Sequence, residues 1–184
     1  MRILILLLML TSLVFGYSYK SVLLDAQVSI FPRIILLDKK VQEKLIDDKI
    51  VFTIVYEERD YEAALSIVNK IDESYKGKFG EYKYVLNLVK FSDLTKDTKA
   101  TAFYTLNSSK YIAKVVQVAK EKGIAAFAYD TNNLKHGLLF SLVLEKSTVL
   151  YLNKDSLQNN EIDFVNSLYL IVKFIDKKTQ KEGN

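Results

Sequence analysis

The chain has 184 residues, of which 49% are hydrophobic and 26% charged, and its formal net charge at pH 7 is +4. The length suffices for one domain with a substantial core but hardly for two, and the composition is that of an ordinary globular protein. The basic residues are scattered among acidic ones, which argues against a nucleic-acid-binding surface. Because the sequence has no cysteine, disulfides, thiol catalysis and cysteine-based metal sites are excluded.

Residues 1–16 have the pattern of a secretory signal peptide. Arg2 gives a positive start, residues 3–15 are almost wholly apolar, and a small residue follows at the expected cleavage position. The apolar stretch is shorter than the roughly 20 residues of a membrane-spanning helix, although an uncleaved leader that anchors the N-terminus is the alternative. We therefore expect a periplasmic protein with one domain over residues 17–176 and a charged, disordered tail at 177–184.

The first part of the mature chain predicts a helix, a strand and a second helix. Residues 22–31 carry apolar side chains at helical spacing, so we expect a helix that ends just before Pro32, the only proline. Residues 50–56 are rich in β-branched and aromatic side chains and predict a buried strand. Asp60 is the expected N-cap of the following helix, which Gly77 should end.

The middle of the chain continues this alternation of strands and helices. Residues 84–91, 100–106 and 124–129 predict three more strands. The capping residues Asn107-Ser108-Ser109 follow the second of these, and the helix after them should end at Gly123. Strands that alternate with helices favour parallel pairing, which predicts a layered α/β sheet.

The last third of the sequence departs from the alternation. Residues 138–145 and 148–153 are apolar strands separated by two residues, which indicates an antiparallel hairpin. Residues 161–176 have apolar side chains at helical spacing and predict a closing helix. The predicted fold class is therefore α/β, a layered sheet of parallel βα units with an appended C-terminal hairpin and a closing helix.

The expected sheet places several polar residues in one crevice. If the four parallel strands take the common order second-first-third-fourth, their carboxyl ends meet at the switch point where such sheets bind ligands. A helix N-terminus with free N–H groups and hydroxyls there would suit a small polar or anionic ligand, while plain helix capping is the alternative. The candidate ligand- or partner-binding residues are Tyr56, Glu57, Asn107, Ser108, Ser109, Tyr129 and Asp130.

No catalytic constellation is recognisable in the sequence. His136 is the only histidine, so a triad or a histidine-based metal site has no second imidazole, and a turn role beside Gly137 is favoured. The pair Glu57-Glu58 could serve acid–base chemistry, but a solvated loop explains it equally simply. No glycine-rich phosphate loop, zinc motif or nucleotide fingerprint is present. We therefore expect no enzyme activity, no cofactor and no metal.

The C-terminal third resembles the YfiR-like family of periplasmic regulators. Residues 136–144 correspond to the glycine-led strand of that family, residues 148–153 to its second strand, which ends here in Tyr-Leu-Asn, and residues 164–174 to its final leucine-rich helix. The N-terminal helix ending in Ile30-Phe31-Pro32 fits the same pattern. His136 replaces one expected glycine, and the cysteines of some members are missing.

The resemblance implies a periplasmic regulator that binds, and restrains, the periplasmic domain of an inner-membrane signalling protein. In the family the partner is typically a cyclic di-GMP synthase, and sensor kinases carry the same domain as an input module. The alternative is a small-ligand-binding protein that serves a transporter or sensor; homodimer formation and a bound small ligand both stay open. An exposed apolar patch would favour protein binding, and a closed pocket would favour ligand binding.

Overall fold

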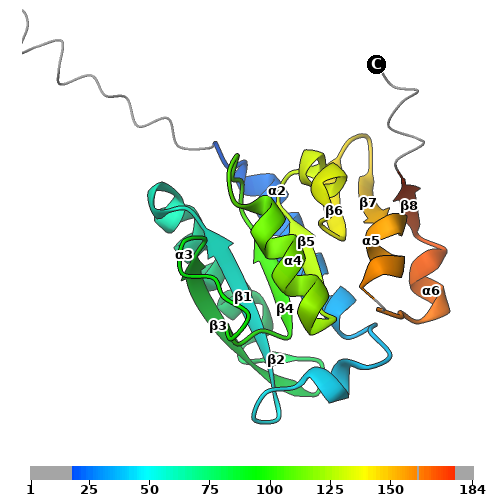
Figure 1. Cartoon of the computed structure of the whole chain (residues 1–184), viewed down its shortest axis with the longest axis horizontal. Helices are drawn as coiled ribbons and strands as arrows, with labels where there is room; N and C mark the ends of the chain where they lie inside the picture. The colour runs from blue at the N-terminus through cyan, green and yellow to red at the C-terminus, as the bar shows by residue number, and fades with distance from the viewer. Residues whose placement is uncertain (1–17, 161, 177–184) are drawn as a thin grey trace, which may run out of the picture.

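The computed structural model describes residues 18–160 and 162–176 (Figure 1). The predicted signal peptide at 1–16 and the predicted tail at 177–184 lie outside the described residues. No helix in the described ranges is long and apolar enough to cross a membrane. The elements are, in chain order, α2 (Ser21–Ile35), η1 (Val41–Lys44), β1 (Lys49–Tyr56), η2 (Glu58–Asp60), α3 (Tyr61–Tyr75), β2 (Lys78–Phe79), β3 (Tyr82–Lys90), β4 (Ala102–Thr105), α4 (Ile112–Lys122), β5 (Ala125–Ala128), η3 (Thr131–His136), β6 (Phe140–Leu144), β7 (Thr148–Asn153), α5 (Lys154–Asn159), α6 (Asn166–Tyr169) and β8 (Val172–Ile175).

The strands form one mixed sheet in the order β2-β3-β1-β4-β5-β6-β7-β8. Strands β3, β1, β4, β5 and β6 are parallel, β2 and β7 are antiparallel to β3 and β6, and β8 is parallel to β7. The first four predicted strands are β1, β3, β4 and β5, so the second-first-third-fourth order is confirmed. The α/β class, the parallel units and the hairpin of β6 and β7 are confirmed as well.

Helices cover both faces of the sheet (Figure 1). The apolar side chains of α2 and α3 share one core cluster with Phe52, Tyr104 and Phe127, whereas those of α4 pack on the opposite face with Val55 and Phe103. Every residue of β1 after the first is buried. The apolar run of this strand, interrupted only by Thr53, is explained by its central position, since a strand covered on both faces has no side open to water.

The prediction that the first helix ends before Pro32 is wrong. Helix α2 continues to Ile35 and holds Pro32 in its last turns. The continuation buries Ile34 and Ile35, which are 2% and 3% exposed, in the same cluster as Phe31. Each of these isoleucines gains roughly 1.5–3 kcal/mol from burial, enough together to outweigh the roughly 3 kcal/mol that proline costs in a helix.

The predicted closing helix over residues 161–176 is also wrong. In its described part, residues 162–176, the segment forms the short helix α6 and then β8, which adds to the outer side of β7 with Leu150 opposite Val172. The open edge of β7 offers main-chain partners that a helix could not use, and β-branched Val172 and Ile175 fit a strand. Alternation in the strand directs Val172 to one core cluster and Ile175 to the other.

Candidate functional site

The carboxyl ends of the central strands meet at one edge of the sheet, as predicted. In the parallel register Val55 of β1 lies beside Thr105 of β4, and Thr105 lies beside Ala128 of β5. The residues that follow these positions therefore emerge next to one another. Asn133 confirms this closeness, since its side-chain amide donates to Asn107 Oδ1 at 3.1 Å.

Tyr19, from the short segment before α2, lies across these strand ends. Its hydroxyl accepts a hydrogen bond from the backbone N–H of Asn107 at 3.2 Å, and the nearby Asp60 carboxylate raises the pKa of this hydroxyl. Its ring packs edge-on against Tyr129, with 4.7 Å between ring centres. The next residue, Lys20, donates its backbone N–H to the Tyr129 hydroxyl at 2.8 Å.

Asp60 does not cap α3 with its side chain, contrary to the prediction. The residue sits at the N-cap position, but its carboxylate makes no capping bond because the chain enters α3 through the 3-10 turn η2. Its side chain is instead buried, at 3% exposed, and lies near enough to Tyr19 for its charge to raise the pKa of that hydroxyl. Asp60, predicted as an N-cap, therefore lies beside Tyr19 at the crevice.

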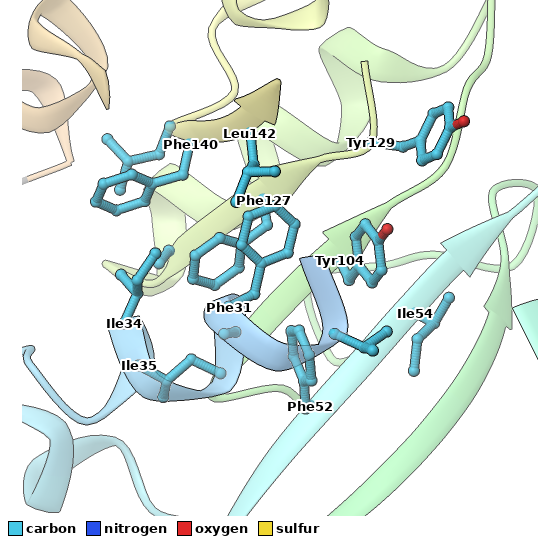
Figure 2. Packing of buried hydrophobic residues seen from close by; sticks show 14 of the residues in the cluster. Phe31, Ile34, Ile35, Phe52, Ile54, Tyr104, Phe127, Tyr129, Phe140 and Leu142 are labelled. Atoms are coloured by element: carbon cyan, nitrogen blue, oxygen red, sulfur yellow. The ribbon is translucent and has the colours of Figure 1, made fainter. Parts of the chain in front are cut away.

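A buried polar network lies next to Tyr129, between helix α2 and the sheet. Gln27 of α2 is fully buried and donates its side-chain N–H to the Tyr129 carbonyl at 2.8 Å and to the Leu142 carbonyl at 3.4 Å. Its side-chain oxygen accepts the hydroxyl proton of Tyr104, which is also fully buried. Gln27 therefore ties α2 to β4, β5 and β6 at the same edge of the sheet (Figure 2 shows both tyrosines).

The tyrosines of the crevice are held in the protonated form. Burial raises the pKa of Tyr19, Tyr104 and Tyr129 above the ordinary value, and the nearby Asp60 carboxylate raises the pKa of Tyr19 further. Their hydroxyls are therefore hydrogen-bond donors and acceptors, not bases or nucleophiles, at any physiological pH. In the described part of the chain no three His, Cys, Asp or Glu residues group as metal ligands.

A cavity of about 350 Å³ adjoins Tyr19 at this edge. It is open to solvent, and both polar and apolar side chains line it. Two apolar lining residues are well exposed, Val22 at 71% and Leu144 at 37%. The lining residues are Ser18, Lys20, Val22, Leu23, Asn107, Tyr129, Asp130, Thr131, Leu142, Val143 and Leu144.

Three of the seven predicted crevice residues, Asn107, Tyr129 and Asp130, line this cavity. Tyr56 and Glu57 end β1 at the same edge but are engaged elsewhere: the Tyr56 ring packs near Tyr61 at 5.9 Å, and Glu57 pairs with Arg59 at 2.9 Å. Local partners in the following 3-10 turn and helix α3 turn both side chains away from the cavity.

Ser108 and Ser109 have different environments. The Ser108 hydroxyl, 7% exposed, accepts the backbone N–H groups of Lys110 and Tyr111, both at 3.1 Å, while Ser109 is exposed. Helix α4 begins only at Ile112, so the serines shape the turn before the helix and do not offer its free N–H groups to a ligand. The helix ends at Gly123, as predicted.

We expect the change Ser108→Ala to lower the free energy of unfolding by about 1 kcal/mol, because two backbone donors lose their acceptor. Ser109→Ala should change it by less than about 0.5 kcal/mol, as at other exposed positions. Urea unfolding of both variants measures the difference. Equal values for the two serines would contradict the assigned roles.

His136 closes the turn η3, and Gly137 follows it with φ +108°. A Cβ at Gly137 would lie 2.8 Å from Val116 Cγ1 of α4, so both the backbone angle and the space require glycine. The predicted turn role of this pair is confirmed. Both residues also line a polar cavity of about 290 Å³ between α4 and α5.

No protein-family model and no curated protein matches the sequence. Among solved structures, the chain is similar to a conserved domain protein from Vibrio cholerae O1 biovar El Tor, with a TM-score of 0.58 and 13% identity over 84% of this chain and 60% of that one. It is also similar to an ABC domain in complex with L-Trp from Streptococcus pneumoniae, with a TM-score of 0.47 and 12% identity over 74% of this chain and 58% of that one. The first likeness shows a shared fold alone, and this chain spans 60% of the Vibrio protein.

The strand β8 presents a second surface of interest at the end of the sheet. Large apolar side chains are exposed along it and the turn before it: Leu170 at 86%, Ile171 at 69% and Phe174 at 42%. The Phe174 ring stacks on Tyr169 of α6, with 6.4 Å between ring centres. We call Leu170, Ile171 and Phe174, with the free edge of β8, the β8 surface.

Proposed function

We propose that this protein is an exported regulator of the YfiR-like kind. It binds the periplasmic domain of an inner-membrane signalling protein, a cyclic di-GMP synthase or a sensor kinase, and restrains it. The observation that carries the proposal is the β8 surface, because contiguous exposed apolar side chains mark surfaces that another molecule covers. The resemblance of the C-terminal third to YfiR-like regulators supplies the class of partner.

The edge of β8, a strand of four residues, lacks two of the common protections against strand pairing, namely a proline and a charge that points along the edge. Edge strands are commonly blunted by short length, by proline or by charges that point along the edge. The opposite edge strand, β2, has only two residues. In β8 the one charged residue, Lys173, is turned onto the sheet, where its ammonium lies 5.3 Å from the centre of the Tyr151 ring. Among the described residues no strand pairs with the outer side of β8, so its main-chain groups there are open to a partner strand.

The chemistry of the β8 surface indicates the occupant. Free N–H and C=O groups along a strand are best met by an extended segment that adds to the sheet. The exposed side chains of Ile171 and Phe174 favour apolar side chains on that segment. After Asp176, which follows β8, come two lysines, Lys177 and Lys178, and their excess of positive charge favours an acidic flank on the partner. We therefore expect an apolar, extended segment with an acidic end.

In-cell crosslinking of the tagged protein in its own host, followed by mass spectrometry, tests this function. The wild-type protein is expected to capture an inner-membrane protein with a periplasmic signalling domain. The double variant Ile171→Ser/Phe174→Ser should capture it at least tenfold less, because each apolar side chain buried at an interface contributes roughly 1.5–3 kcal/mol.

The matched control is Val85→Ser in β3, which is 37% exposed and lies toward the other end of the sheet. This variant should capture the partner as well as the wild type does. Circular dichroism of all variants checks that the fold is retained. Equal capture by the wild type and the β8 double variant would contradict the docking proposal. Capture of a transporter permease instead would favour a ligand-binding protein that serves a transporter.

Binding of a small ligand is the second candidate function, and the cavity of about 350 Å³ beside Tyr19 favours it. Its volume is in the range of small-molecule sites, and both polar and apolar groups line it. The cavity is open, however, and its rim includes exposed Val22 and Leu144. Because a closed pocket is what a dedicated solute carrier needs, the regulatory function is the better supported of the two.

A further inference from the structure

One aromatic side chain in the crevice comes from the chain's own N-terminal segment. Tyr19 belongs to no helix or strand, yet it contacts groups that follow three separate strands, namely Asp60 after β1, Asn107 after β4 and Tyr129 after β5. The crevice at the switch point of a parallel sheet is where such folds hold their ligands. Tyr19 therefore lies at the edge of the sheet where such folds bind their ligands.

The contacts of Tyr19 are specific for a phenol. The backbone N–H of Asn107 donates to the Tyr19 hydroxyl oxygen at 3.2 Å, and the nearby, buried Asp60 carboxylate raises the pKa of this hydroxyl, which keeps it protonated. The Tyr129 ring meets the Tyr19 ring edge-on, with an angle of 66° between the ring planes. A ring without a hydroxyl would forgo this hydrogen bond and leave the Asn107 N–H without its acceptor, which should weaken its binding about tenfold.

The segment that carries Tyr19 borders open space. Ser18 and Lys20, on either side of Tyr19, are exposed, and both line the cavity of about 350 Å³. Apart from Tyr19 itself, the bond from the Lys20 backbone N–H to the Tyr129 hydroxyl holds the segment at this edge. Asn107 and Tyr129, which contact Tyr19, also line this cavity, so a molecule bound there lies next to the partners of the Tyr19 ring.

We infer that Asp60, Asn107 and Tyr129 form a binding site for a 4-hydroxyphenyl group, and that Tyr19 occupies it as a tethered competitor. A free phenolic ligand would displace Tyr19 and release residues 18–20 from the crevice. Because Tyr19 is part of the same chain, its ring competes at an effective concentration of the order of millimolar. The apparent affinity for a free ligand is therefore reduced in proportion to the small fraction of molecules in which the site is open. This site is separate from the β8 surface and does not depend on the function proposed for it.

Calorimetric titration with p-cresol tests the inference directly, because this small molecule is the side chain of tyrosine. The variant Tyr19→Ala is expected to bind p-cresol at least tenfold more tightly than the wild type does. Toluene, which has the same shape without the hydroxyl, should bind Tyr19→Ala at least tenfold more weakly than p-cresol. Tyr19→Phe keeps a ring in the site that lacks the hydroxyl and competes less well, so its affinity for p-cresol should lie between those of the wild type and Tyr19→Ala.

Two results would overturn the site: equal affinity of Tyr19→Ala and the wild type for p-cresol, or equal affinity of Tyr19→Ala for toluene and p-cresol. A measurement on the wild-type protein covers the case in which Tyr19→Ala does not fold. Excess p-cresol is then expected to shift the Asn107 amide resonance in a saturable way, because this N–H changes its acceptor. An amide that stays unmoved up to the solubility limit of p-cresol also overturns the inference.

Discussion

Phe31→Ala is expected to lower the free energy of unfolding by about 3–5 kcal/mol. Phe31 is fully buried at the centre of the main core cluster. Its ring stacks on Phe127 with 4.6 Å between centres and meets Tyr104 edge-on at 5.3 Å (Figure 2). Truncation would leave a cavity between α2 and the sheet that these rigid rings cannot close.

Urea unfolding followed by circular dichroism measures this loss. The matched control is Val22→Ala in the first turn of the same helix, where the side chain is 71% exposed and the change should stay within about 0.5 kcal/mol. A loss below about 1 kcal/mol for Phe31→Ala would mean that α2 does not hold the core in the described way. Since α2 also carries the segment with Tyr19, the same result would weaken the account of the crevice.

The strands and helices of the sheet were predictable because their side-chain patterns agree with their final surroundings. β1 is apolar except for Lys49 and Thr53 and is buried on both faces. Helix α4 has an apolar stripe and ends at Gly123, whose φ of +62° suits glycine. In these elements local preference and tertiary packing favour the same structure. The strand order then followed from the common arrangement of parallel βα units.

The errors fall where tertiary contacts outweigh the local pattern. Pro32 indicates a helix end in any sequence, but Ile34 and Ile35 have apolar partners only if the helix continues. Residues 172–175 fit a helical stripe as well as a strand, and the open edge of β7 decides for the strand. Neither the partners of the isoleucines nor the open edge can be known before the sheet is assembled.

The crevice was predicted in place but not in composition. The ends of β1, β4 and β5 were expected to meet, and Asn107, Tyr129 and Asp130 do line a cavity there. Tyr19 and Gln27 were missed, because contacts over 88 and 102 residues of chain leave no local signal. A glutamine at a buried position of an otherwise apolar helical stripe is the one sign that was available in the sequence.

Gln27 links the fold to the crevice, and its replacement should have the next largest effect after that of Phe31→Ala. Gln27→Leu keeps the volume of the side chain but removes the acceptor of the Tyr104 hydroxyl and the donor to the Tyr129 carbonyl. Both groups are buried, so we expect a loss of roughly 2–4 kcal/mol in the free energy of unfolding. The exposed Gln117 of α4 gives the control, since Gln117→Leu should cost less than about 0.5 kcal/mol.

The double variant Gln27→Leu/Tyr104→Phe separates the hydrogen bond from mere packing. Removing the Tyr104 hydroxyl together with its acceptor leaves one unpaired group fewer, so the double variant should be more stable than Gln27→Leu alone, although it carries one substitution more. If Tyr104→Phe instead adds a further loss to Gln27→Leu, the network is not what holds α2 to the strand ends. Partial recovery would establish that the position of α2, and with it that of Tyr19 in the crevice, rests on a polar contact within an apolar core.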